Sequence, residues 1–358
     1  MFPDKFRIGF LPAYTSDFTA LRKMGVTWLL GGPQPGNVTV ADYHSQATAA
    51  GFEKVTLGFN FTTDWSANPP AGTIGQWNNL SDPLSYGTHG LDELPSNNYY
   101  CRWSAANAGL LVPAYLAAQK TAARPFFQVV DHSVASLPDV ADDAHPYSKA
   151  QGQAVAAGSD VGLFDDYMIA TGRPVTAAPA SWQAIIDGWN ALSGSKPFIG
   201  IVEVQAQPSQ GANRRAPTAQ EVSFEMGLMA AMGSRGIVLF PDAGATLQAA
   251  PEVQAAVAKF AAMVKAHQSV FDAPPGTVTT TGTVYSSTRN GVTLAANNST
   301  SPAQFMGVTL APLDFQLIGT PPAPTPAPAV QYATEAEMKA VMARVAVLEN
   351  HAGIRSPR

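Results

Sequence analysis

Polar side chains recur at the points where the apolar, strand-like runs of this chain end. They are Asn60, Asp92, Glu93, Asp131, His132, Asp165, Asp166, Tyr167, Glu203, Gln205 and Asp242. Carboxyl groups that converge on one site can act as general acid and as nucleophile, which is what cleavage of a glycosidic bond requires. Glu203 is the most informative, because it directly follows the apolar run 198–202. A carboxylate buried there is either paired structurally or kept for function.

The elements that must position these side chains alternate along the chain. Strand-like runs are predicted at 7–11, 27–30, 54–60, 125–131, 161–165, 197–205 and 236–240, with helical stretches such as 105–120 and 182–192 between them. This alternation is typical of βα units around a parallel sheet. Seven strands are clear and a closed barrel needs eight, so we place the fourth at 86–93, inside the long gap between 60 and 125.

We therefore predict that residues 1–272 form an α/β fold, a (β/α)8 TIM barrel. The carboxyl ends of the strands build the active site in this fold, so the polar side chains above are expected to share one mouth. Trp65 lies in the long segment before the fourth strand, with Trp77, Tyr99, Tyr100 and Trp103 nearby. These aromatic rings are either sugar-binding platforms or part of loop packing, and the sequence leaves both readings open.

The composition changes after the predicted barrel. Residues 273–318 are rich in Thr, Val, Asn and Ser with strand-like alternation, which predicts a small β-sandwich domain, and 319–332 form a Pro-rich linker. Residues 333–358 are predicted to be a helical, coiled-coil-like tail, because Met338, Val341, Val345 and Leu348 recur at spacings of three and four. We expect homo-oligomerisation or anchoring through this tail, with docking on its own barrel as the alternative.

Charge and motif content exclude several function classes. The formal net charge of −5 provides no basic footprint for nucleic acid, and no apolar run approaches the ~20 residues of a membrane span. No cofactor or metal site is predicted, because Cys101 is the single cysteine and the acidic cluster 139–145 lacks the pattern of a calcium loop. The N-terminus lacks the apolar core of a secretory signal peptide, so synthesis in the cytoplasm is expected.

Four short motifs resemble a known enzyme family. The chain carries LDELP at 91–95, VEVQ at 202–205, RAPTAQE at 215–221 and GSRGI at 233–237. These motifs resemble clan-A glycoside hydrolase barrels, and more closely the poorly characterised members with an Asp-Glu-Pro acid motif. The last two motifs match well and cover the final quarter of the predicted barrel. The first departs from the pattern by an inserted Leu94, and most clan-A enzymes have Asn where Asp92 stands.

The resemblance implies a retaining glycosidase that cleaves a polysaccharide or cell-surface glycan. Glu93 would be the acid/base and Glu203 the nucleophile, with Tyr167 hydrogen-bonded to that nucleophile. Contacts to the sugar are expected from Asn60, Trp65, Asp92, Asp131, His132, Asp166, Tyr167, Gln205 and Asp242.

A second hypothesis keeps the fold without the catalysis. The missing signal peptide, the tail and the altered acid motif also fit a catalytically inactive carbohydrate-binding or structural component of a phage particle, such as a tail-associated or decoration protein. Because fold alone does not establish function, both hypotheses stand at this point.

Overall fold

Eight parallel strands form the centre of the computed structural model, which describes residues 3–11, 13–32, 38–58, 85–89, 105–121, 125–207, 215–242 and 246–319. The strands are β1 (Arg7–Phe10), β2 (Trp28–Gly32), β3 (Lys54–Gly58), β4 (Ser85–His89), β5 (Phe126–Val130), β6 (Val161–Phe164), β7 (Phe198–Glu203) and β8 (Gly236–Phe240). Each pairs in parallel with the next, and β8 pairs with β1, which closes the sheet into a barrel. The fourth strand, predicted by counting, is confirmed at Ser85–His89.

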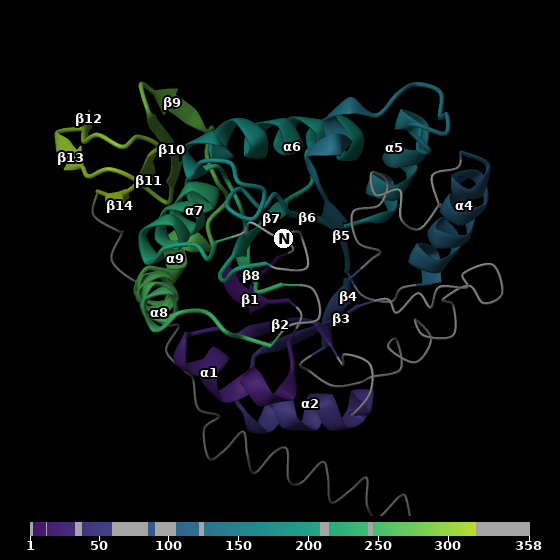
Figure 1. The fold of residues 1–358 in the computed structure, drawn as a ribbon, viewed down its shortest axis with the longest axis horizontal. Coiled ribbons are helices and arrows are strands. Elements are labelled where there is room, and N and C mark those ends of the chain that lie inside the picture. Colours follow the sequence, from purple (N-terminus) through teal and green to yellow (C-terminus); the bar gives the residue numbers. More distant parts are fainter. Residues whose placement is uncertain are drawn as a thin grey trace, which may run out of the picture. The chain divides into compact units, whose positions relative to one another are not determined.

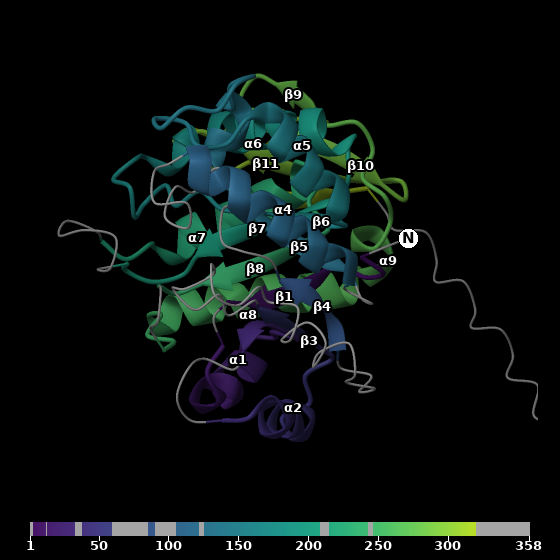
Figure 2. The ribbon, with the colours of Figure 1, turned by 90° about the vertical axis from the view of Figure 1, so that its right-hand side faces the viewer.

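Helices lie on the outside of these strands (Figures 1 and 2). They are α1 (Phe18–Lys23), α2 (Val40–Ala49), α4 (Ala105–Thr121), α5 (Lys149–Gly158), α6 (Ala178–Ser193), α7 (Ala219–Ala231), α8 (Pro251–Ala266) and the short α9 (Gln268–Phe271). Three-residue to five-residue 3₁₀ helices occur at Thr15–Asp17, His132–Ser136 and Val175–Ala177. The segment between β3 and β4 lies outside the described residues. The predicted (β/α)8 order is therefore confirmed for the eight strands and for the connections that carry a described helix.

The strands bury two apolar faces because successive side chains point to opposite sides of the sheet. One cluster, which includes Phe127, Leu163, Ile199, Ile201 and Val238, fills the inside of the barrel. The alternate residues pack between strands and helices in a second, larger cluster. Along β7 the inward positions are those of Ile199 and Ile201, and Glu203 is the next position in this alternation.

An antiparallel sheet follows the barrel. Its order is β14 (Phe315–Ile318), β11 (Val292–Asn297), β10 (Val284–Arg289) and β9 (Thr279–Thr281), and a hairpin is formed by β12 (Ala303–Phe305) and β13 (Val308–Leu310). The predicted β-rich region is confirmed. However, residues 273–318, which are described throughout, form one sheet with a hairpin instead of the two sheets of a sandwich.

The packing of this sheet explains why no second sheet is needed. One face contributes Val292 and Leu294 to the core shared with the barrel helices, and the other packs Val284 and Ala295 against Leu310 of the hairpin. Helix α7 therefore provides the apolar layer that a partner sheet would supply in a sandwich.

The barrel and the antiparallel sheet belong to one compact unit, which extends to Pro321. The domain boundaries predicted within it stay predictions. The Pro-rich linker beyond Gly319 and the tail 333–358 lie outside the described residues, so the predicted linker, coiled coil and oligomer also stay predictions. Among the described helices, none has the length and apolarity to cross a membrane.

Candidate functional site

Four predicted site carboxylates lie at one edge of the barrel. Asp131 follows β5, Asp166 follows β6, Glu203 ends β7 and Asp242 follows β8. Because these neighbouring strands are parallel, their carboxyl ends meet at the same edge. The structure thus brings this part of the predicted site together.

The other half of the predicted site falls outside the described part of the chain. Asn60, Trp65, Asp92 and Glu93 are not among the described residues, and for His132 only the backbone is described. The separation of the Glu93 and Glu203 carboxyl groups, which distinguishes retaining from inverting mechanisms, therefore stays untested.

Glu203 is held in place by backbone amides. Its side chain is 2% exposed. Oε1 accepts a hydrogen bond from the Ile169 amide at 2.5 Å, and Oε2 accepts one from the Ala170 amide at 2.9 Å. Both donors belong to the turn after β6, in which the Thr171 amide donates to the Tyr167 carbonyl. Two amide donors stabilise the ionised carboxylate and leave it a single orientation.

Burial nevertheless dominates the titration of Glu203. It raises the pKa of this carboxyl from 4.5 to about 7, against the lowering effect of the Ile169 and Ala170 amides and of the Arg215 charge. Glu221 raises the same pKa further. A carboxyl group with this pKa is divided between its acid and base forms near neutral pH, which is a property of catalytic carboxyl groups.

A second buried carboxyl, that of Glu225 on α7, was missed by sequence reasoning. It is 1% exposed, and among the described residues its Oε1 has no hydrogen-bond partner. Burial, and then the nearby charges of Glu203, Glu221 and Asp166, raise its pKa well above the usual range. Glu225 therefore keeps its proton at pH values where an ordinary carboxylate has lost it. The available signal was its position inside the apolar stretch 222–232 of a predicted helix.

The start of α7 explains the RAPTAQE motif. Thr218 and Glu221 form a capping box, in which the Thr218 amide donates to Glu221 Oε2 at 2.8 Å. Arg215 adds two hydrogen bonds to the same carboxylate, at 2.8 and 2.5 Å. The motif thus builds a helix start, and it also places the Arg215 charge close enough to Glu203 to lower the pKa of that carboxyl.

Tyr167 does not hydrogen-bond Glu203, which corrects the expectation from the resemblance. Its hydroxyl donates to Asp165 Oδ2 at 3.2 Å, and its ring stacks on Phe240 with centroids 5.0 Å apart. The oxygens of Glu203 are bonded to backbone amides instead.

Three further predicted site residues bond to their own chain. Asp166 pairs with Arg173 and accepts the Ser181 hydroxyl from α6. Asp131 accepts the Ser133 amide at 3.1 Å and so begins a 3₁₀ helix.

The third of them is Gln205. Its side chain accepts the Gln248 amide at 2.6 Å and donates to the Thr246 carbonyl at 3.3 Å. All three thereby hold loops around the barrel edge, and their contacts to a sugar stay predictions, as does that of the buried Asp242. Within the described ranges, no three His, Cys, Asp or Glu side chains are grouped so that they could hold a metal ion.

No protein-family model and no curated protein matches this sequence. Solved structures resemble it in fold. The β-galactosidase of Rahnella sp. R3 is 10% identical with a TM-score of 0.51, over 74% of this chain and 56% of that one. The β-galactosidase of the psychrophilic Marinomonas ef1 is also 10% identical, with a TM-score of 0.49 over 73% and 60% of the two chains.

An endo-β-1,4-mannanase from Thermotoga petrophila is 10% identical, with a TM-score of 0.47, over 82% of this chain and 84% of that one. The chain spans less than two thirds of the length of either β-galactosidase. At 10% identity, the similarity to the Rahnella β-galactosidase shows a shared fold and nothing finer. The barrel of this chain is therefore of a type that also occurs in a glycoside hydrolase.

Proposed function

We propose that this chain is a glycoside hydrolase that cleaves a polysaccharide with retention, with Glu203 as nucleophile and Glu93 as acid/base. The observation that carries the proposal is the buried carboxyl of Glu203 at the end of β7, at the edge where barrels of this fold bind their substrates. The fold shared with a β-galactosidase supports the same class of reaction.

In the proposed reaction the Glu203 carboxylate attacks the anomeric carbon while Glu93 gives its proton to the leaving oxygen. A covalent glycosyl–enzyme forms, and water activated by the Glu93 carboxylate then cleaves it. The Ile169 and Ala170 amides orient the nucleophile, and each carboxylate oxygen retains a lone pair for the attack. Because the pKa of Glu203 is about 7, its ionised carboxylate, which is the attacking form, becomes the major form only above that pH in the free protein.

Trapping of the covalent intermediate tests this proposal directly. The protein would be incubated with 2-deoxy-2-fluoro-galactosyl, -mannosyl and -glucosyl fluorides at pH 7.5, and the modified peptide identified by mass spectrometry. We expect labelling at Glu203, loss of labelling in Glu203→Gln, and full labelling in Glu252→Gln, a matched control on the exposed start of α8. Labelling at another carboxylate would overturn the assignment of the nucleophile.

Glycan binding without cleavage is the second candidate, and specific contacts favour it. Both oxygens of Glu203 already accept amides, and Asp131, Asp166 and Gln205 are engaged by their own chain. In that case no fluorosugar labels the protein and no reducing ends are released, while wild type and Glu203→Gln retain equal affinity for the same polysaccharide. The place of such a protein on a phage particle rests on the tail 333–358 and stays a prediction.

A further inference from the structure

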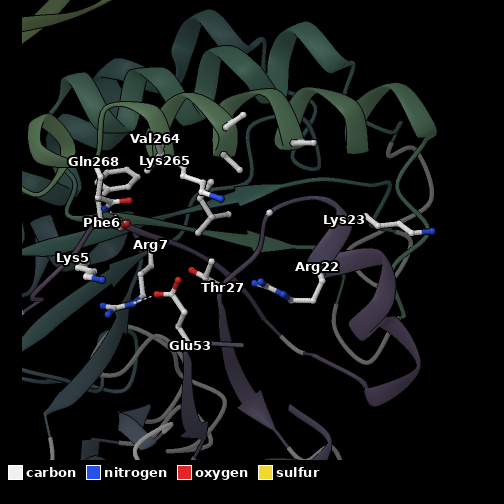
Figure 3. Close-up of a pocket in the computed structure, with 15 residues that line it drawn as sticks. Lys5, Phe6, Arg7, Arg22, Lys23, Thr27, Glu53, Val264, Lys265 and Gln268 are labelled. Atoms are coloured by element: carbon white, nitrogen blue, oxygen red, sulfur yellow. Dashed lines mark hydrogen bonds and ion pairs between the residues drawn. The ribbon is translucent and has the colours of Figure 1, made fainter. Parts of the chain in front are cut away.

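A cavity of ≈370 Å³ opens at the amino-terminal end of the barrel (Figure 3). Lys5 precedes β1, Thr27 precedes β2 and Glu53 precedes β3, and all three line it. Lys265, in the last turn of α8, lines the opposite wall. Because the strands meet this cavity at their amino ends, it lies at the end of the barrel opposite to Glu203, and the proposed catalysis does not use it.

The cavity is strongly positive. Its lining holds five cations and one carboxylate, namely Lys5, Arg7, Arg22, Lys23 and Lys265 against Glu53. The chain as a whole carries a formal net charge of −5, so the positive charge of the lining is opposite in sign to the net charge of the protein. A concave surface lined by one sign of charge attracts ligands of the opposite sign.

Two of the five cations are arginines with defined partners. Arg7 pairs with Asp4 at 2.6 Å and lies 3.6 Å from Glu53, so the only carboxylate of the lining is already engaged. Arg22 donates to the Val26 carbonyl at 2.6 Å and lies over the Phe52 ring, 5.3 Å from its centroid, and within the described ranges it forms no ion pair.

The three lysines carry the remaining charge. Lys5, Lys23 and Lys265 are exposed, and within the described ranges none of them forms an ion pair. In Figure 3 the side chains of Arg22 and Lys265 point toward the lining residues, whereas that of Lys23 extends away from them. Within the described part of the chain, four cations of the lining therefore have no carboxylate partner.

Small side chains make the room between these charges. The α8 wall consists largely of Ala258, Ala261 and Ala262. Gly25, with a φ of +80°, lets α8 pack closely at the edge of the cavity, because a Cβ there would lie 2.5 Å from the Cβ of Ala261. Cations in the last turns of α1 and α8 also offset helix dipoles, but that role does not account for the convergence of two helix ends and Lys5 on one cavity.

We propose that this cavity binds a small multivalent anion through a phosphate group, either free or as an ester. Its volume is within the range of small-molecule sites, and lysine ammonium groups are common partners of phosphate oxygens. The alanine wall next to the charges provides an apolar surface for the organic part of an ester.

Isothermal titration calorimetry tests this site with inorganic phosphate and, separately, with glycerol 3-phosphate. The variant is Lys5→Gln/Lys265→Gln, and Lys259→Gln is the matched control, since Lys259 lies exposed on α8 outside the cavity. A charge pair near 4 Å in water is worth about fivefold in affinity, so we expect the double variant to bind roughly twentyfold more weakly. Lys259→Gln should bind like wild type, and added salt should weaken binding.

Each outcome decides the proposal. Tighter binding of the ester than of inorganic phosphate identifies an organic phosphate as the ligand, and equal binding identifies the phosphate group alone. The proposal is overturned if wild type shows no saturable binding of either probe. It is equally overturned if the double variant, shown to be folded by circular dichroism, binds as tightly as wild type.

Discussion

Replacing Glu203 by Gln should flatten the pH dependence of this protein's stability. In the folded protein the pKa of Glu203 is about 7, against 4.5 for an unperturbed glutamate. Between these two values the folded state holds the proton and the unfolded state has lost it, so the unfolding free energy falls as the pH rises. Over this interval of about 2.5 units, at about 1.4 kcal/mol per unit, the loss amounts to about 3 kcal/mol.

Glu203→Gln removes this contribution because the amide does not titrate. Gln offers one acceptor oxygen to two amide donors, so the variant is expected to lose about 1–3 kcal/mol near pH 4.5. On raising the pH to 7.5, the wild type loses the additional stability calculated above and the variant does not. The difference between the two proteins should therefore shift by about 3 kcal/mol in favour of the variant.

Urea denaturation followed by tryptophan fluorescence measures this difference, since Trp28, Trp182 and Trp189 are buried and report on the core. The titration would run from pH 4.5 to 8 for wild type, Glu203→Gln and the exposed control Glu252→Gln. Because the Glu203 charge raises the pKa of Glu225, the same three titrations in a Glu225→Gln background separate the contribution of Glu203 from that of Glu225. Equal slopes in wild type and Glu203→Gln would refute the reasoning, because they would mean that Glu203 carries no burial-raised pKa.

Three further substitutions have expected outcomes. Glu225→Gln mimics the protonated carboxyl and should change the unfolding free energy by less than about 1 kcal/mol at pH 5; a loss of several kcal/mol in urea denaturation would show that Glu225 is ionised there. Arg215→Ala removes two hydrogen bonds to Glu221 and a charge that lowers the pKa of Glu203. The stability slope assigned to Glu203 should then extend to higher pH, and an unchanged slope would place Arg215 outside this network. Arg289→Met leaves the buried carbonyls of three residues without their donor, so it should cost about 3 kcal/mol or more and lower the melting temperature; a neutral result in calorimetry would contradict this packing role.

Local patterns in the sequence predicted the barrel well. Apolar runs identified seven of the eight strands. The remaining strand, β4, has little β propensity of its own, and it was placed because a closed barrel requires eight strands. The capping box at Thr218 was equally predictable, because both of its residues lie within one helical turn. Glu203 stood out because it ends an apolar strand, and the structure confirms its burial.

Contacts between distant segments were beyond these patterns. The amides that hold Glu203 come from residues 33 and 34 positions earlier in the chain. Residues 273–318 form one main sheet instead of a two-sheet sandwich, because α7 covers one of its faces. The alternation of residues along the strands does not reveal that a helix, and not a second sheet, packs there.

By itself the sequence determined the parallel barrel, the polar residues at its strand ends and the β-rich region after it, because these depend on periodicity and turn chemistry within short windows. Only the tertiary structure decided which of those polar residues are bound by their own chain, and that Glu225 lies buried near Glu203. It also assembled a positive cavity from β1 and α1 together with α8, which lies more than 200 residues further along the chain. Charge and burial at a point in space depend on every segment that reaches it, and no local pattern contains that information.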